Sequence, residues 1–188
     1  ARDEKIGNKM INARSETVRS KPAFRSAYES RRCIIPASAF FEWKREETRK
    51  QPFVIYRKDF DLVGGEGTAL AFAGLWERWE SPEEGWIRSV TILTTQANAF
   101  MARVHDRMPV ILERDAYALW LDPETPPDDE SFTAIRKPPP EDLLAMHPVS
   151  ADVNSPRNNR ADLLEPVDTP EPFRRRDEPG GPEQGELL

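Results

Sequence analysis

Short runs in which apolar and polar residues alternate fill most of the first two thirds of the chain. A period of two is typical of strands that turn one face to a core. The pattern predicts strands at residues 52–58, 69–76 and 89–95, and a short strand followed by a turn within residues 11–17. Residues 69–76 are apolar throughout, which favours a strand buried on both faces. Residues 31–44 predict two more strands, separated at Pro36-Ala37-Ser38.

Helical spacing is confined to short segments. The first predicted helix has Ser20 as its N-cap, Pro22 in its first turn, and Phe24 and Tyr28 on its inner face. Further helical segments are expected at residues 97–102, 114–121 and 141–146. Within the second of these, the inward residues are Tyr117, Trp120 and Leu121. A closing strand is predicted at residues 147–150.

Many short strands and few helices predict an α+β fold. We expect mainly short antiparallel strands in a bent or barrel-like sheet with a few flanking helices. One domain should cover residues 1–167. Residues 168–188, rich in Pro, Arg and Glu, cannot build a core and are predicted to be a disordered tail.

Composition narrows the class of protein. Nothing resembles a membrane span or a signal peptide, so we expect a cytoplasmic protein without a membrane partner. The single cysteine, Cys33, excludes an internal disulfide and a cysteine-based zinc cluster, and no metal or cofactor is expected. Because Cys33 sits in the apolar run Cys-Ile-Ile-Pro, a buried structural thiol is favoured.

Charge is unevenly distributed along the chain. The net charge is −6, yet residues 1–60 hold fifteen Lys and Arg against eight Asp and Glu, a local +7 that leaves −13 for the remainder. Such asymmetry permits a basic face for a polyanion on an acidic protein. A solvated surface is the alternative reading of the same block.

The densest polar motif is residues 104–112, Val-His-Asp-Arg-Met-Pro-Val-Ile-Leu. His105 can exchange protons near neutral pH, and Arg107, two residues on, suits a phosphate. Pro109 cannot donate to a sheet ladder, so these side chains stand at a strand entrance. The alternative is a structural ion pair between Asp106 and Arg107 beside a hydrogen-bonded histidine.

Three other strands carry polar residues at positions suited to a site. Asn12 and Arg14, two residues apart, fall on one strand face. Glu42 lies among three aromatic residues, where partial desolvation raises its pKa toward the range useful for acid–base chemistry. An outward-pointing Glu42 at a strand end is the open alternative. Thr94 is one of two hydroxyls that end the strand at residues 89–95.

Five motifs in this order resemble the SOS-response-associated peptidase (SRAP) family: I-N-A-R-S-E-T, R-R-C-I-I-P-A-S-A-F-F-E-W-K, F-A-G-L-W-E, T-I-L-T-T-Q-A-N and V-H-D-R-M-P-V-I-L. H-P-V-S and the loop that follows extend the likeness to about residue 167. The resemblance implies recognition of abasic sites in single-stranded DNA. It also implies a covalent thiazolidine crosslink made by an N-terminal Cys, and autoproteolytic removal of N-terminal residues.

The resemblance assigns roles residue by residue. Asn12 orients the terminal amine and the sugar, Glu42 acts in the acid–base steps, and His105 protonates the sugar oxygen. Arg14 and Arg107 hold the DNA backbone, and Thr94 lines the site.

The printed sequence lacks the family's first block, which contains the nucleophilic Cys. We therefore expect a fragment, a gene read from an internal start, or a degenerate member, and the crosslink to require the missing block. The alternative function is a non-covalent module for single-stranded or junction DNA. A small hydrolase ranks last, because no Ser-His-Asp or Cys-His set stands out. We expect a monomer that associates with the nucleoid when it is bound to DNA.

Overall fold

The structure is a computed structural model that describes residue 7 and residues 10–45, 50–125 and 130–167. Within these residues the strands form two open sheets, accompanied by three short α-helices. The fold is α+β with short and mainly antiparallel strands, as predicted, although neither sheet closes into a barrel. The tail predicted at residues 168–188 lies outside the described part of the chain.

The strands in chain order are β1 (Asn12–Arg14), β2 (Arg32–Ala37), β3 (Phe40–Arg45), β4 (Lys50–Arg57), β5 (Leu70–Ser81), β6 (Gly85–Gln96), β7 (Arg107–Pro109) and β8 (Leu144–Pro148). The α-helices are α1 (Arg25–Ser30), α2 (Tyr117–Leu121) and α3 (Glu130–Ile135). Single 3-10 turns occur at η2 (Met101–Arg103), η3 (Arg114–Ala116), η4 (Ala151–Asn154) and η5 (Ala161–Leu164).

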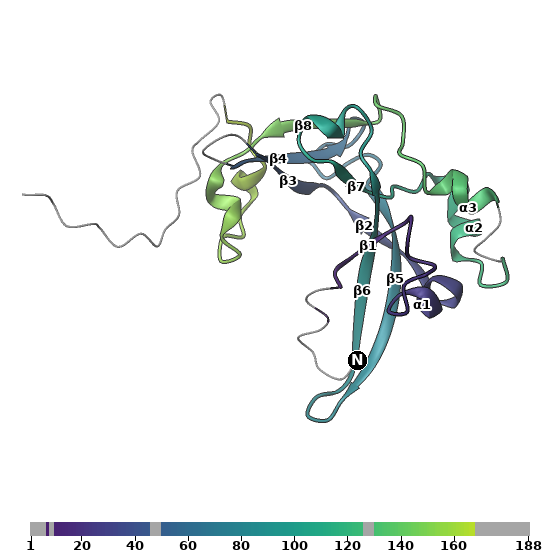
Figure 1. Cartoon of the computed structure of the whole chain (residues 1–188). Helices are drawn as coiled ribbons and strands as arrows, with labels where there is room; N and C mark the ends of the chain where they lie inside the picture. Colours follow the sequence, from purple (N-terminus) through teal and green to yellow (C-terminus); the bar gives the residue numbers. More distant parts are fainter. Residues whose placement is uncertain (1–6, 8–9, 46–49, 126–129, 168–188) are drawn as a thin grey trace, which may run out of the picture.

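The larger sheet, sheet A, has the strand order β1-β6-β5-β2, and β7 also pairs with β6. β5 and β6 form a long twisted hairpin whose turn projects away from the rest of the molecule (Figure 1). β1 adds to β6 in parallel and β7 in antiparallel fashion, so both short strands meet on the C-terminal end of β6. This arrangement brings residues 12–14 and 107–109 to the same strand.

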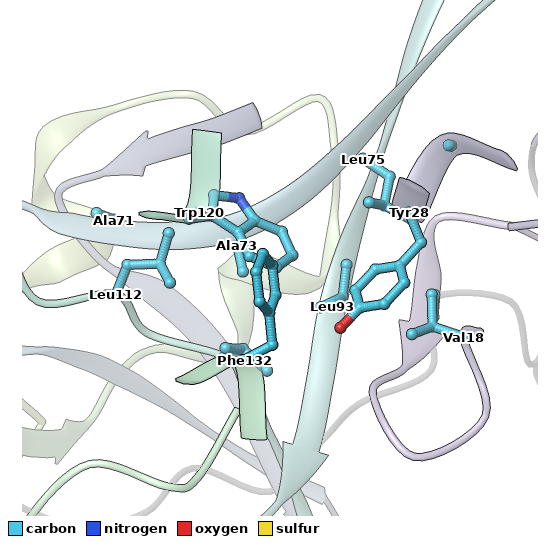
Figure 2. Packing of buried hydrophobic residues seen from close by; sticks show 12 residues of the cluster. Val18, Tyr28, Ala71, Ala73, Leu75, Leu93, Leu112, Trp120 and Phe132 are labelled. Atoms are coloured by element: carbon cyan, nitrogen blue, oxygen red, sulfur yellow. The ribbon is translucent and has the colours of Figure 1, made fainter. Parts of the chain in front are cut away.

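One face of sheet A, here called the helix face, packs against the helices. Its small and aliphatic residues are Ala13, Ala71, Ala73, Leu75 and Leu93, all at most 5% exposed. Tyr28 of α1, Trp120 of α2 and Phe132 of α3 fill the space above them, and Figure 2 shows these rings beside Leu93 and Ala73. The ring centroids lie 5.9–6.4 Å apart in tilted and edge-on pairs. The three large rings fill most of the space between the helices and the sheet, so several of the facing strand positions hold small side chains such as alanine.

The opposite face of sheet A, here called the sheet-B face, packs on sheet B, which has the order β3-β4-β8. Leu70 and Phe72 of β5 meet Ile55 of β4 and Leu144 of β8 in a second apolar cluster. Phe40 of β3 joins it through an edge-on contact with Phe72, with ring centroids 5.7 Å apart.

The structure corrects several local predictions. The first helix begins at Arg25, with Phe24 rather than Ser20 at its N-cap, because Phe24 and Tyr28 must both reach the core. β2 continues through Ala37 and the break falls at Ser38, since Pro36 and Ala37 pair with Ala71 and Leu70.

Further corrections concern the C-terminal half. The strand β8 begins at Leu144, where a helical turn was predicted, because residues 144–148 pair with β4. The helix expected at residues 97–102 is only the 3-10 turn η2. Leu121 is 47% exposed, and Leu119 packs against the core in its place. Among the described residues, no helix is both long and apolar enough to cross a membrane.

Candidate functional site

Arg107, the first residue of β7, is held by two partners. Its Nη1 and Nη2 donate to Oε1 and Oε2 of Glu16 at 2.7 and 2.9 Å, a bidentate ion pair. Nη2 also donates to the backbone oxygen of Thr94 at 2.6 Å and to Thr94 Oγ1 at 3.3 Å. An ion pair between Asp106 and Arg107 was the alternative suggested by the sequence. In the structure the ion-pair partner of Arg107 is Glu16 instead.

His105 stands immediately before β7 and turns one nitrogen to the backbone. Its Nδ1 lies 3.0 Å from the backbone nitrogen of Arg107, 3.2 Å from the backbone oxygen of Arg107 and 3.3 Å from Oδ1 of Asp106. Because Nδ1 faces one donor and two acceptors, the role it takes follows from the tautomer of the ring. The side chain is 41% exposed, so a substrate can reach the ring.

Asn12, Arg14 and Thr94 share the sheet-B face of sheet A. Asn12 pairs with Ile92 and Arg14 with Thr94, and aligned partners in a sheet point to the same side. Asn12 and Arg14 are exposed, whereas Ala13 between them is buried in the helix face. The period-two prediction for this strand is confirmed.

Glu42 approaches this region from sheet B. It is two residues from Phe40, so it lies on the side of β3 that packs on Phe72 of the sheet-B face. Burial raises the pKa of the Glu42 carboxyl above its ordinary value, and the charge of protonated His105 and a hydrogen bond from the backbone of Trp43 lower it in part. The carboxyl is half-buried and within electrostatic reach of His105, which disfavours the outward-pointing alternative.

Glu16 lies between the two arginines assigned to DNA. The hydrogen bond from Arg107 lowers the pKa of the Glu16 carboxyl, and the charges of Arg107 and Arg14 act in the same direction. Its carboxylate is therefore ionised at neutral pH and partly cancels the positive charge of the two guanidinium groups.

These contacts connect most of the residues singled out from sequence. Arg14, Thr94 and Arg107 are joined through β6 and Glu16, while Glu42 and His105 are joined by their charges. The contact between the backbone N–H of Arg107 and Nδ1 of the His105 side chain links the two groups. Asn12 is placed near them by strand register.

Cys33 lies apart from these residues, as the second residue of β2. It pairs with Gly74 of β5, where an added Cβ would lie 3.0 Å from Cys33 Sγ and 2.7 Å from Ile35 Cδ1. The thiol is half-buried rather than fully buried, and burial raises its pKa. A raised pKa leaves little thiolate at neutral pH, which is typical of a structural cysteine.

Glu16 is the residue at this site that the sequence reasoning missed. It follows Arg14 at the same spacing of two that drew attention to Asn12 and Arg14, although the strand has already ended there. Its partner Arg107 is 91 residues away, so only the fold reveals the pair. Within the described residues, no group of three or more His, Cys, Asp or Glu side chains could hold a metal ion.

A family model supports the resemblance drawn from the motifs. The model for SOS response associated peptidase (SRAP) matches residues 1–156. The chain belongs to the SRAP family.

Individual relatives carry more specific names. The chain is 47% identical over 167 residues to the abasic site processing protein YoaM of Bacillus subtilis (strain 168). The matched region covers 88% of this chain and 70% of YoaM. The chain is 34% identical over 173 residues to the abasic site processing protein HMCES of Xenopus tropicalis, covering 85% of this chain and 51% of that one.

Solved structures share the fold. A crystal structure of a protein from Bacteroides thetaiotaomicron superposes with a TM-score of 0.75 at 26% identity, covering 89% of this chain and 72% of that one. A protein from Bordetella bronchiseptica gives a TM-score of 0.62 at 33% identity, with coverage of 74% and 64%.

Proposed function

We propose that this chain recognises abasic sites in single-stranded DNA, and that the intact protein protects them by forming a covalent DNA–protein crosslink. Relatives named abasic site processing proteins support the first part. The observation that carries the proposal is the half-buried carboxyl of Glu42 within electrostatic reach of His105, beside Arg14 and Arg107. That set combines two proton-transfer groups with two cations suited to a sugar–phosphate strand.

The proton-transfer pair suits the chemistry of an abasic sugar, which is mostly a closed hemiacetal. Ring opening moves a proton from the C1 hydroxyl to the ring oxygen and exposes the aldehyde. His105 delivers the proton to the ring oxygen, and Glu42 accepts the proton of the hydroxyl. Burial raises the pKa of Glu42 and so moves this carboxyl toward the range useful for acid–base chemistry.

Covalent capture then requires an amine and a thiol on the same residue. The amine adds to the aldehyde, water leaves as the imine forms, and the thiol adds to the imine carbon while its proton moves to nitrogen. The product is a thiazolidine and one water molecule. Cys33 cannot supply both groups, because it lies within β2 and has no free α-amine. We assign the step to an N-terminal Cys, as the family resemblance implies.

Arg14 and Arg107 hold the phosphates on either side of the missing base, since guanidinium groups bind phosphate through paired hydrogen bonds. Asn12 orients the terminal amine and the sugar, and Thr94 lines the site beside Arg107. Autoproteolytic release of residues that precede the Cys belongs to the same proposal, with Glu42 as the acid–base group.

The test of recognition compares single-stranded oligonucleotides of one sequence, intact or with a central tetrahydrofuran abasic analogue that cannot crosslink. Fluorescence anisotropy should show tighter binding to the analogue, and Asn12→Ala should reduce that preference more than Lys50→Ala, a control substitution at an exposed position of β4. Equal affinity for both strands would favour the alternative, a non-covalent module for single-stranded or junction DNA.

A further inference from the structure

The guanidinium of Arg107 has no free edge in this structure. Nη1 and Nη2 are engaged by Glu16, and Nη2 also donates to Thr94. Nε is buried and lacks a hydrogen-bond partner, so the edge formed by Nε and Nη2 is closed to a large ligand. A phosphate that binds Arg107 through two hydrogen bonds must therefore take the place that Glu16 occupies.

A carboxylate and a phosphate present a similar pair of oxygens to an arginine fork. We propose that Glu16 is an intramolecular stand-in for a DNA phosphate: it holds the guanidinium of Arg107 in the free protein, and the bound strand displaces it. The inference rests on the proposed function, because it assumes that Arg107 contacts a DNA phosphate.

The pair is suited to exchange rather than to permanent closure. The Glu16 side chain is 49% exposed, so the pair is screened by solvent and contributes little to folding stability. Arg107 is only 21% exposed, and Thr94 holds it from the other side. Glu16 can therefore leave while the guanidinium keeps its position.

Two cations other than Arg107 lie near Glu16 and can pair with it after displacement. It lines a pocket of about 430 Å³ together with Arg136 and Lys137, on the side of β6 where Thr95 is buried. Arg136 is itself fixed by a hydrogen bond from Nη1 to the backbone oxygen of Ser15 at 3.1 Å. A displaced Glu16 carboxylate can turn toward these cations instead of remaining against the incoming phosphate.

This arrangement makes Glu16 a residue that sets the overall affinity for a DNA strand. Every strand that binds through Arg107 must first break the pair between Glu16 and Arg107, so intact and abasic strands are both held less tightly than two free arginines would hold them. The preference for an abasic strand comes from other contacts, because the cost of displacing Glu16 is the same for both strands.

The experiment measures anisotropy of an oligonucleotide with the tetrahydrofuran analogue over a series of KCl concentrations. Glu16→Gln removes the charge and should tighten binding by roughly two- to fivefold, the range expected for an exposed ion pair. The slope of log K against log salt should change by less than about 0.7, the value for one phosphate on a single strand, because Arg107 contacts the same phosphate with and without Glu16. Intact single-stranded DNA should gain about as much affinity as the abasic strand.

Glu113→Gln is the matched control. Glu113 accepts a hydrogen bond from Arg57 Nη1 at 2.8 Å and its side chain is also 49% exposed, so this variant breaks a comparable pair with the same change in net charge. It should change affinity less than Glu16→Gln does. In an Arg107→Ala background, the effect of Glu16→Gln should fall to that of Glu113→Gln.

The outcomes separate the two proposals. Binding by the wild-type protein with equal or weaker binding by Glu16→Gln would overturn the displacement model and assign Glu16 to the orientation of Arg107. A wild-type protein that binds no single-stranded DNA would overturn the proposed function and this inference together. If Glu16→Gln lowers the melting temperature enough to prevent the assay, Glu16→Ala opens the same guanidinium edge and must give the same direction.

Discussion

The two faces of sheet A are built from neighbouring residues of the same strands, yet one face packs into the core beneath the helices and the other bears the residues of the candidate site. On the helix face, Ala13 and Leu93 are buried beneath Tyr28, Trp120 and Phe132. On the sheet-B face, one residue along in each strand, Arg14 and Thr94 stand at the edge of an apolar cluster, and Thr94 accepts a hydrogen bond from Arg107. The side-chain alternation of a strand thus separates the buried core from the candidate site by a single position. Substitutions one residue apart should have different consequences.

The largest effect is expected from the helix face. Trp120→Ala should lower the free energy of unfolding by about 3–5 kcal/mol, because it leaves a cavity and removes the 2.8 Å hydrogen bond from Trp120 Nε1 to the backbone oxygen of Cys33. Urea denaturation followed by circular dichroism measures the loss. Arg14→Ala, on the exposed sheet-B face, should change stability by less than about 0.5 kcal/mol. Similar losses in the two variants would break the comparison between the faces.

The next effect concerns the rate of crosslinking in a protein that carries a family-type N-terminal block beginning with Cys. Glu42→Gln and His105→Ala should each slow adduct formation roughly a hundredfold, at the low end of what a general acid or base contributes. The time course of a denaturing gel shift gives the rates. The exposed strand residue Lys50 again supplies the control, because Lys50→Ala should leave the rate unchanged. Full activity in both site variants would remove the two residues from the chemistry.

A smaller effect is expected for the cations. Arg14→Ala and Arg107→Ala should each weaken single-stranded DNA binding with little dependence on sequence, and each should lower the salt slope by about 0.7 if it contacts one phosphate. Anisotropy titrations at several salt concentrations measure both quantities. Unchanged affinity in both variants would mean that these arginines serve only the structure.

The smallest effect is the pH dependence of stability. The pKa of Glu42 in the folded protein is raised above 4.5, so the folded protein keeps this proton at a pH where the unfolded chain has already released it. The stabilisation is therefore fully present below pH 4.5 and is lost as pH rises from 4.5 through the folded-state pKa. The pKa of Glu16 is lowered, so its contribution is lost as pH falls below 4.5. Melting temperatures of the two glutamine variants, measured from pH 3 to pH 8, should depend less on pH than those of the wild type. This difference should appear above pH 4.5 for Glu42→Gln and below pH 4.5 for Glu16→Gln. Identical profiles for wild type and Glu42→Gln would show that Glu42 is not desolvated.

Much of this arrangement could be predicted from local pattern. The spacing of two between Asn12 and Arg14 and the position of Glu42 among aromatic residues both indicated the correct strand faces. Side chains alternate between the two faces of any strand, so this pattern does not depend on which other strand it pairs with.

The remainder depends on contacts between distant residues. Leu144 begins a strand because β4 offers it partners, although its local sequence favours a helical turn. Glu16 meets Arg107 only because β1 and β7 both add to β6. The helix α3 was not predicted, and Phe132 within it becomes buried by packing on rings from two other helices. Such tertiary effects override local preference and leave no short-range signal.

The central claim is that the sheet-B face processes an abasic sugar through a terminal nucleophile and does not use Cys33. The most direct measurement is a denaturing gel shift with an abasic oligonucleotide, with and without borohydride, for the protein that carries the N-terminal block beginning with Cys. We expect a heat-stable adduct without reductant that persists in Cys33→Ser and is lost when the terminal Cys becomes Ser. An adduct that Cys33→Ser abolishes and the terminal substitution leaves intact would contradict it.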